Sequence, residues 1–152
     1  MSLFEDFLAA AEAEFNETAA PGPADATELG VDIACTDDIP AGFPLVSGYT
    51  TLAQSIYRRL TSPRGSVIDA PDYGLDVREY LSRGLTQAQL AAMPGEIRAE
   101  VLKDERVHDC SVTVVSSTDT VLELAFSVRA EDGPFTFTVS VSEAGAALNG
   151  GV

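Results

Sequence analysis

The sequence is poor in several residue types, and each shortage counts against a class of function. It has no tryptophan, so a sugar-binding cleft would lack the indole ring that stacks on a sugar. Cys35 and Cys110 are too few and too far apart for a disulfide framework or a zinc site, and we expect both to be free. His108 is the single histidine, and residues two apart on a strand share a face. A catalytic contact with Cys110 is thus one hypothesis, although a histidine beside a buried cysteine is far more common.

Positive charge is also scarce. The formal net charge is −15, the pI is about 4.1, and residues 1–57 contain no lysine or arginine. Binding to nucleic acid or to anionic lipid requires basic side chains at the phosphates, so no nucleic acid partner is expected. No apolar run approaches the roughly 20 residues that span a bilayer, and Met1–Asp6 lacks the basic start of a signal peptide. We therefore expect a protein that works in water, without membrane insertion.

The chain divides into two expected parts. In residues 3–16 the apolar side chains Phe4, Leu8, Ala11 and Phe15 recur every three or four positions, which predicts an amphipathic helix. A stretch rich in alanine, proline and glycine follows and predicts a flexible linker. Residues 1–26 are thus expected to form an N-terminal helix and linker, and residues 27–152 the main domain. The apolar stripe has two candidate destinations, this domain or helices of another protein.

The first part of the main domain predicts helices joined by irregular segments. Residues 27–49 are interrupted by prolines and glycines and are expected to be irregular. Apolar spacing predicts the helices that follow. The last of them begins with a capping box formed by Thr86 and Gln89, and Pro94 inside it should kink it or split it in two. The three predicted helices cover about residues 50–60, 75–81 and 86–102.

The last third of the chain alternates apolar and polar residues. A period of two predicts strands that bury one face. Short turns separate these strands, so they are expected to pair as an antiparallel meander. The predicted fold is α+β, with helices followed by a three-stranded antiparallel meander. The alternating stretches cover residues 110–114, 122–128 and 135–141.

Two short blocks in the middle of the chain carry a family resemblance. They are Leu60–Ser66, which reads LTSPRGS, and Pro71–Asp76, which reads PDYGLD. With the order of helices and strands, they resemble the phage tail baseplate wedge family over about residues 44–142. That family includes sheath-initiating proteins of contractile tails, some formerly labelled lysozyme-like, and the small baseplate component of type VI secretion and other contractile injection systems. The resemblance implies a fold similar to the linking domain of tail sheath subunits.

The chain departs from the family pattern between the last helix and the first strand. The family often has an acid–proline–arginine triplet there, whereas this chain reads KDERV at Lys103–Val107. Asp104 and Arg106 fill the acidic and basic positions, and Glu105 replaces the proline. The resemblance therefore implies an acid–arginine pair at this corner without a rigid proline turn.

A structural role without catalysis or cofactor is what the resemblance implies. The protein would be a baseplate wedge subunit that joins other wedge proteins and templates the first ring of the tail sheath. Its partners would be those wedge proteins, the sheath subunit and the tube or hub protein, repeated with the tail's rotational symmetry. It would be assembled in the cytoplasm and reside in the virion tail baseplate, or in the host cytoplasm as part of a cellular injection system. The last predicted strand could accept a strand from a neighbour at its edge. The predicted partner-interface residues are Phe4, Leu8, Phe15, Arg59, Arg64, Asp104, Arg106, Phe135, Phe137, Val139 and Val141.

Simpler interpretations compete for several of these residues. Arg59 and Arg64 can belong to a solvated helix end, where cations complement the helix dipole. Asp104 and Arg106 can form a surface pair worth under about 1 kcal/mol. Residues 71–74, in the second block, can be an interaction loop, or Gly74 can simply supply a backbone turn that no other residue tolerates.

Other functions remain as alternatives. An assembly adaptor or chaperone of similar build would leave the finished particle. A muramidase-like enzyme would have to use the carboxylates of Asp69, Asp72, Asp76 and Glu79, one of them with a raised pKa, and such clusters arise by chance in an acidic chain. The same aspartates could offer oxygen atoms to calcium, but they lack the spacing and central glycine of an EF-hand loop. The structural role is therefore preferred.

Overall fold

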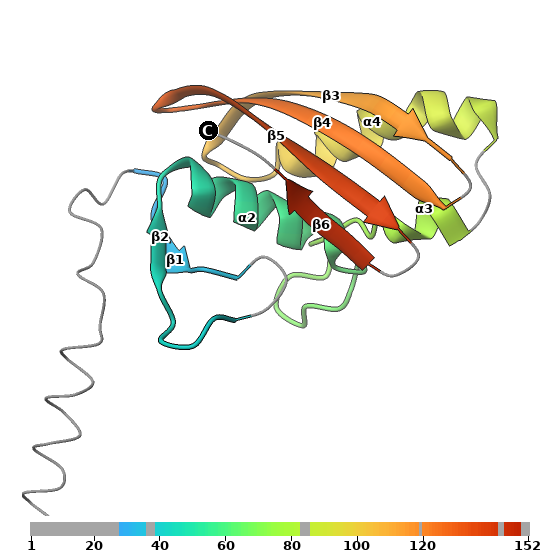
Figure 1. Cartoon of the computed structure of the whole chain (residues 1–152). Helices are drawn as coiled ribbons and strands as arrows, with labels where there is room; N and C mark the ends of the chain where they lie inside the picture. Colours follow the sequence, from blue (N-terminus) through green and yellow to red (C-terminus); the bar gives the residue numbers. More distant parts are fainter. Residues whose placement is uncertain (1–27, 36–38, 83–85, 119, 143–144, 150–152) are drawn as a thin grey trace, which may run out of the picture.

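The computed structural model describes residues 28–35, 39–82, 86–118, 120–142 and 145–149. Over these residues the fold is α+β, as predicted, with helices before the main sheet (Figure 1). The predicted N-terminal helix and its linker lie outside the described residues. The elements in chain order are β1 (Val31–Ile33), β2 (Leu45–Ser47), α2 (Tyr49–Thr61), α3 (Arg78–Ser82), α4 (Gln87–Val101), β3 (Val107–Ser117), β4 (Val121–Ala130), β5 (Gly133–Ser142) and β6 (Gly145–Asn149).

The main sheet has one strand more than predicted. Among the described residues it is a four-stranded antiparallel meander in the order β3-β4-β5-β6. The three predicted strands are confirmed, and β6 adds to the far side of β5 with Val139 opposite Leu148. Sequence alternation did not reveal β6 because it is short and contains small residues such as Ala146 and Ala147. As a result β5 is an internal strand, and the prediction that it is a free edge is wrong.

One face of the sheet carries the core, and the helices cover that face (Figure 1). Helix α2 contributes Leu52, Ile56 and Leu60, which are fully buried at helical spacing. Phe126 and Phe137 stack across β4 and β5 with ring centroids 4.8 Å apart. Each such side chain stabilises the fold by about 1.5–3 kcal/mol relative to exposure. No described helix is both long enough and apolar enough to cross a membrane.

Helix α4 begins and ends within one residue of the predicted bounds. Thr86 caps its first turn, and the capping box with Gln89 is present. The helix runs without a break through Pro94, so of the two predicted effects of this proline, a kink or a split, the split does not occur. A proline inside a helix costs about 3 kcal/mol, because one backbone hydrogen bond is lost and the ring crowds the preceding turn. Met93 and Ile97, on either side of the proline, are both fully buried, and their packing offsets this cost.

A short hairpin of β1 and β2 replaces the irregular segment predicted before α2. Its strands are antiparallel, with Ile33 opposite Leu45. The buried side chain of Gln54, on α2, donates to the Ile33 carbonyl at 2.7 Å and accepts from the Cys35 N–H at 2.8 Å. The carboxamide of Gln54 therefore satisfies one backbone acceptor and one backbone donor, as the backbone of a paired strand would. These two bonds hold the hairpin against α2.

Candidate functional site

The two sequence blocks that carry the resemblance meet at the C-terminal end of α2. The last carbonyl groups of a helix have no partner within the helix. Here the backbone N–H of Leu75 donates to the Arg59 carbonyl at 2.9 Å, and that of Val77 donates to the Leu60 carbonyl at 3.0 Å. The end of the second block therefore caps the C-terminus of α2, and the first block continues the chain from that same C-terminus.

Gly74 is required at this junction for steric reasons. Its φ is +97°, in the region that side chains rarely adopt, and a Cβ atom here would lie 2.3 Å from the Ser62 carbonyl oxygen. The predicted role of this glycine as a special turn is confirmed. It also lets the two blocks approach each other at backbone distance.

The centre of the site is Glu100, near the end of α4, whose side chain is 1% exposed. Its carboxylate contacts Arg59 at 3.1 Å, Arg64 at 2.9 Å and Lys103 at 2.7 Å. The Gly74 N–H also donates to it at 3.0 Å. Burial by itself would raise the pKa of Glu100, but the bonds from Lys103, Arg59 and the Gly74 N–H outweigh it and hold the pKa below its usual value. The carboxylate is thus an ionised centre that joins both blocks to α4.

Sequence reasoning missed Glu100. An acid on a helix is common, and the helix as a whole shows many polar residues. A signal was nevertheless present, because Glu100 follows Met93 by seven positions and Ile97 by three. That spacing places it on the buried stripe of α4, where an acid needs a cationic partner.

Arg59 and Arg64, two predicted interface residues, both serve this internal cluster. The Arg59 side chain is 14% exposed, and its guanidinium lies 4.4 Å from the centre of the Tyr73 ring. Arg64 also donates from Nε to the Gly74 carbonyl at 3.2 Å, but 52% of its side chain stays exposed. Of the two, Arg64 retains the surface that a partner could contact, and that role stays a prediction.

Asp104 and Arg106 form the pair that the resemblance implied. The guanidinium of Arg106 donates to both carboxylate oxygens, at 2.8 and 2.7 Å. The same guanidinium reaches the Leu29 carbonyl and the Ser55 hydroxyl, each at 2.8 Å. Burial would raise the pKa of Asp104, but the bonds from Arg106 lower it on balance. This partly buried pair ties the corner before β3 to α2 and to the start of the described chain, with the exposed Glu105 between them.

The other predicted interface residues divide into two groups. Phe4, Leu8 and Phe15 lie outside the described residues. Four predicted interface residues on β5 are at most 6% exposed and belong to the chain's own core. They are buried because they alternate onto the face of the sheet that the helices cover. The buried β5 residues are Phe135, Phe137, Val139 and Val141.

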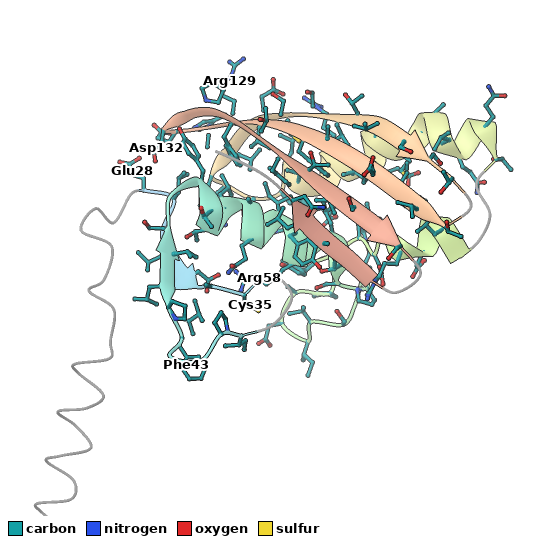
Figure 2. All side chains as sticks on the ribbon, in the orientation of Figure 1. Glu28, Cys35, Phe43, Arg58, Arg129 and Asp132 are labelled. Carbon is teal, nitrogen blue, oxygen red and sulfur yellow. The ribbon has the colours of Figure 1, made fainter. Side chains whose placement is uncertain are left out.

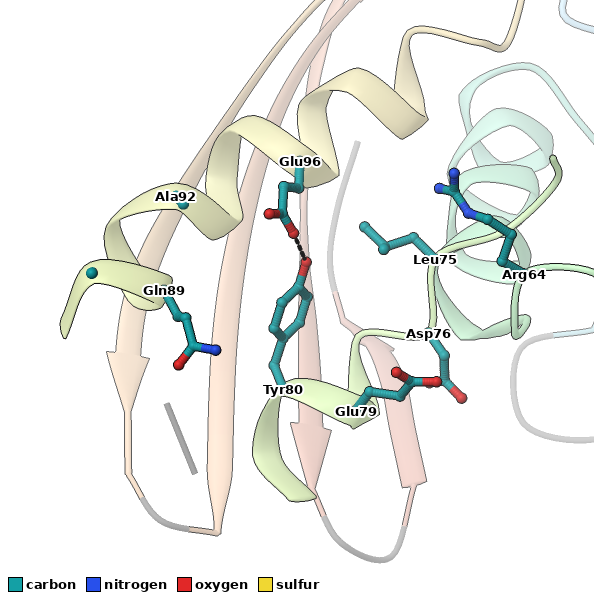
Figure 3. A pocket seen from close by; sticks show the side chains of 9 residues that line it. Arg64, Leu75, Asp76, Glu79, Tyr80, Gln89, Ala92 and Glu96 are labelled. Atoms are coloured by element: carbon teal, nitrogen blue, oxygen red, sulfur yellow. Dashed lines mark hydrogen bonds between the residues drawn. The ribbon is translucent and has the colours of Figure 1, made fainter. Parts of the chain in front are cut away.

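A cavity of about 550 Å³ lies between α3 and α4, beside the Glu100 cluster (Figure 3). Asp76 and Glu79 line it, so two of the four carboxylates considered for a muramidase come together here. Burial would raise the pKa of Asp76, but its bonds with Arg78 outweigh this and lower it. Asp76 therefore lacks the raised pKa that a general acid needs.

The other chemical hypotheses meet specific obstacles. A bulge at the start of β3 turns His108 outward, where it contacts Glu131 at 2.6 Å, while Cys110 is buried. The two residues therefore do not share a face, as a regular strand would require. Burial raises the pKa of Cys110 to about 11, which keeps this thiol protonated. Among the described residues, no three acidic, histidine or cysteine side chains form a group that could hold a metal ion.

The fold has a known counterpart among solved structures. No family model matches the chain, and no curated protein matches it significantly. A crystal structure from Geobacter sulfurreducens, described as a "putative tail lysozyme", is similar with a TM-score of 0.52 at 16% sequence identity. The similarity covers 64% of this chain and 92% of that chain. At this level of identity, the similarity shows a shared fold.

Proposed function

We propose that the protein is a structural baseplate wedge subunit of a contractile tail or contractile injection system. The observation that carries the proposal is the fold that this chain shares with the tail lysozyme structure, over 92% of that chain. The two sequence blocks support it, because they are built around one buried carboxylate and do not form an isolated loop. In this role the subunit joins other wedge proteins and provides the first template for the sheath.

The sheet offers a physical means of templating. Within the described residues, β3 is one edge of the sheet, and it is an eleven-residue strand. The outer edge of such a strand presents backbone donors and acceptors to which a neighbouring chain can add a strand. Val115, on β3, is 60% exposed and adds an apolar contact for that strand. The corner formed by Asp104 and Arg106 holds the beginning of this edge in place.

Deleting the gene and examining the particles by electron microscopy tests the role. A wedge subunit predicts particles without a baseplate, or tubes without a sheath. Intact contractile particles in the deletion strain would refute the proposal. A strain expressing Arg64→Ala, compared with one expressing Arg129→Ala as an exposed control, then tests whether Arg64, the half-exposed arginine of the Glu100 cluster, contacts a partner.

The alternatives differ in measurable ways. Quantitative mass spectrometry of finished particles should find the protein in a fixed copy number, whereas an assembly adaptor or chaperone would be absent. A muramidase would release fragments from purified peptidoglycan. Alanine substitutions at Asp72, Asp76 and Glu79 would have to abolish that release while circular dichroism showed an unchanged fold.

A further inference from the structure

The β1–β2 hairpin exposes an apolar face. Side chains alternate along a strand, so Asp32 points toward α2, where it bonds with Arg58, and Val31 and Ile33 point away from it. Val31 is 42% exposed, Ile33 is 39% exposed, and Leu45, directly opposite Ile33, is 45% exposed. These three side chains form one outer face, which we call the hairpin face.

Phe43 is a fourth exposed apolar residue and lies two positions before Leu45 in the chain. It lies away from the main sheet and points outward from the body of the protein (Figure 2). The side chain is 59% exposed, and its φ of 46° is the single positive value among the described non-glycine residues. A bulky residue rarely adopts this conformation. Together with the hairpin face, this exposed ring forms apolar surface of the kind that marks an interaction site.

We propose that residues 3–16 of this same chain cover the hairpin face. Their apolar stripe of Phe4, Leu8, Ala11 and Phe15 supplies a complementary surface. As a helix, fourteen residues would be about 21 Å long, which exceeds the roughly 10 Å of a three-residue strand. The contact goes beyond the proposed assembly role and does not depend on it.

The point of attachment favours this segment over other occupants. Leu29 is 1% exposed and its carbonyl accepts a bond from Arg106, so the chain is anchored immediately before the hairpin. Residues 17–27 can extend about 36 Å from that anchor, far enough to lay the stripe on the hairpin face. A tether of this length gives the stripe an effective concentration of the order of millimolar.

Charge gives a second reason. A second copy of the chain brings its whole net charge of −15 and would be repelled more strongly than residues 3–16, which hold four acidic side chains. In residues 3–16 the acidic side chains Glu5, Glu12 and Glu14 flank the stripe on the predicted helix. They would face water when the stripe is docked, and Asp32 beneath the hairpin is already neutralised by Arg58.

The absence of tryptophan allows a direct test. In the full chain, Phe43→Trp places one indole two positions from Leu45 of the hairpin face, without any background emission. We expect its emission at short wavelength, typical of a covered ring. Adding Leu8→Asp should shift the emission to longer wavelength. Adding Ala13→Asp should not, because Ala13 lies on the opposite side of the predicted helix and introduces the same charge.

Three results would overturn the proposal. They are a long-wavelength emission with the stripe intact, equal effects of the two aspartates, and a shift that depends on protein concentration. The last would indicate a second copy as the occupant, and the first would leave the face to a different protein. Hydrogen exchange of the β1 and β2 amides, compared between Leu8→Asp and Ala13→Asp in chains that keep Phe43, tests the contact even if the tryptophan variant does not fold.

Discussion

Replacing Glu100 by glutamine would remove one buried negative charge and keep the shape of the side chain. Breaking a fully buried ion pair costs about 3–5 kcal/mol. The pair of Glu100 with Arg59 is close to fully buried, because the Arg59 side chain is only 14% exposed. Arg64 and Lys103 are 52% and 40% exposed, so water screens them and each contributes under about 1 kcal/mol. The glutamine oxygen can still accept the Gly74 N–H bond, and we therefore expect the free energy of unfolding to fall by about 3 kcal/mol.

Urea denaturation at pH 7, followed by far-UV circular dichroism, measures this loss. Glu105→Gln is the matched control, because Glu105 is an exposed glutamate just after α4. Its substitution should change the free energy of unfolding by no more than about 0.5 kcal/mol. Both variants lose one carboxylate, so the difference between them isolates the buried cluster. If Glu100→Gln destabilised the protein no more than Glu105→Gln, the structural role given to the cluster would be refuted.

The pH dependence gives a second measurement of the same effect. The pKa of Glu100 in the folded protein lies below its ordinary value of 4.5, because burial, which raises it, is outweighed by the bonds from Lys103 and Arg59. A lowered pKa stabilises the fold above the unfolded value, and this contribution is lost as the pH falls through the folded value. The stability difference between the native chain and Glu100→Gln should therefore shrink below pH 4.5. A difference that stays constant down to pH 3 would contradict this.

Further predictions concern glycines and thiols. Gly74→Ala should lower the free energy of unfolding, measured by urea denaturation, by at least about 2 kcal/mol, because its Cβ would collide with the Ser62 carbonyl. Gly95→Ala, within α4 and with open space around the added Cβ, should raise it by about 0.5–1 kcal/mol. Equal effects of the two substitutions would contradict the steric argument. In the folded protein, a thiol reagent should label Cys35 and leave Cys110 unlabelled until urea unfolds the chain. The reason is that Cys110 is buried and that burial raises the pKa of its thiol to about 11. Mass spectrometry of the labelled peptides checks this, and early labelling of Cys110 would contradict it.

Much of the fold could be predicted because it depends on local periodicity. The stripe of α2, the capping box at Thr86 and the alternation of the three long strands are each visible within about fifteen residues. The hairpin was missed because its position depends on Gln54, which bonds with Ile33 and Cys35 about twenty residues earlier in the chain. Strand β6 was missed because Ala146 and Ala147 give no contrast between its faces.

The candidate site could be predicted only in part for a similar reason. The arginines and Gly74 were visible in the sequence, and the pairing of Asp104 with Arg106 could be inferred from a resemblance. Glu100, the common partner of Arg59, Arg64 and Gly74, lies on α4, 36 positions after Arg64. Only the packing of α4 against the sheet shows that this acid is buried and that the nearby arginines neutralise it.

The contacts of Glu100 also have a consequence for folding kinetics. The meander joins neighbouring strands through short turns, whereas this cluster joins Glu100 to Arg59 and Gly74, which are 41 and 26 positions away. Closing long loops is slower than forming local pairs. We expect the segment between α2 and α3 to become ordered after the transition state, so that Gly74→Ala would accelerate unfolding and leave the folding rate nearly unchanged. The two sequence blocks would then determine mainly how long the protein stays folded once it has formed.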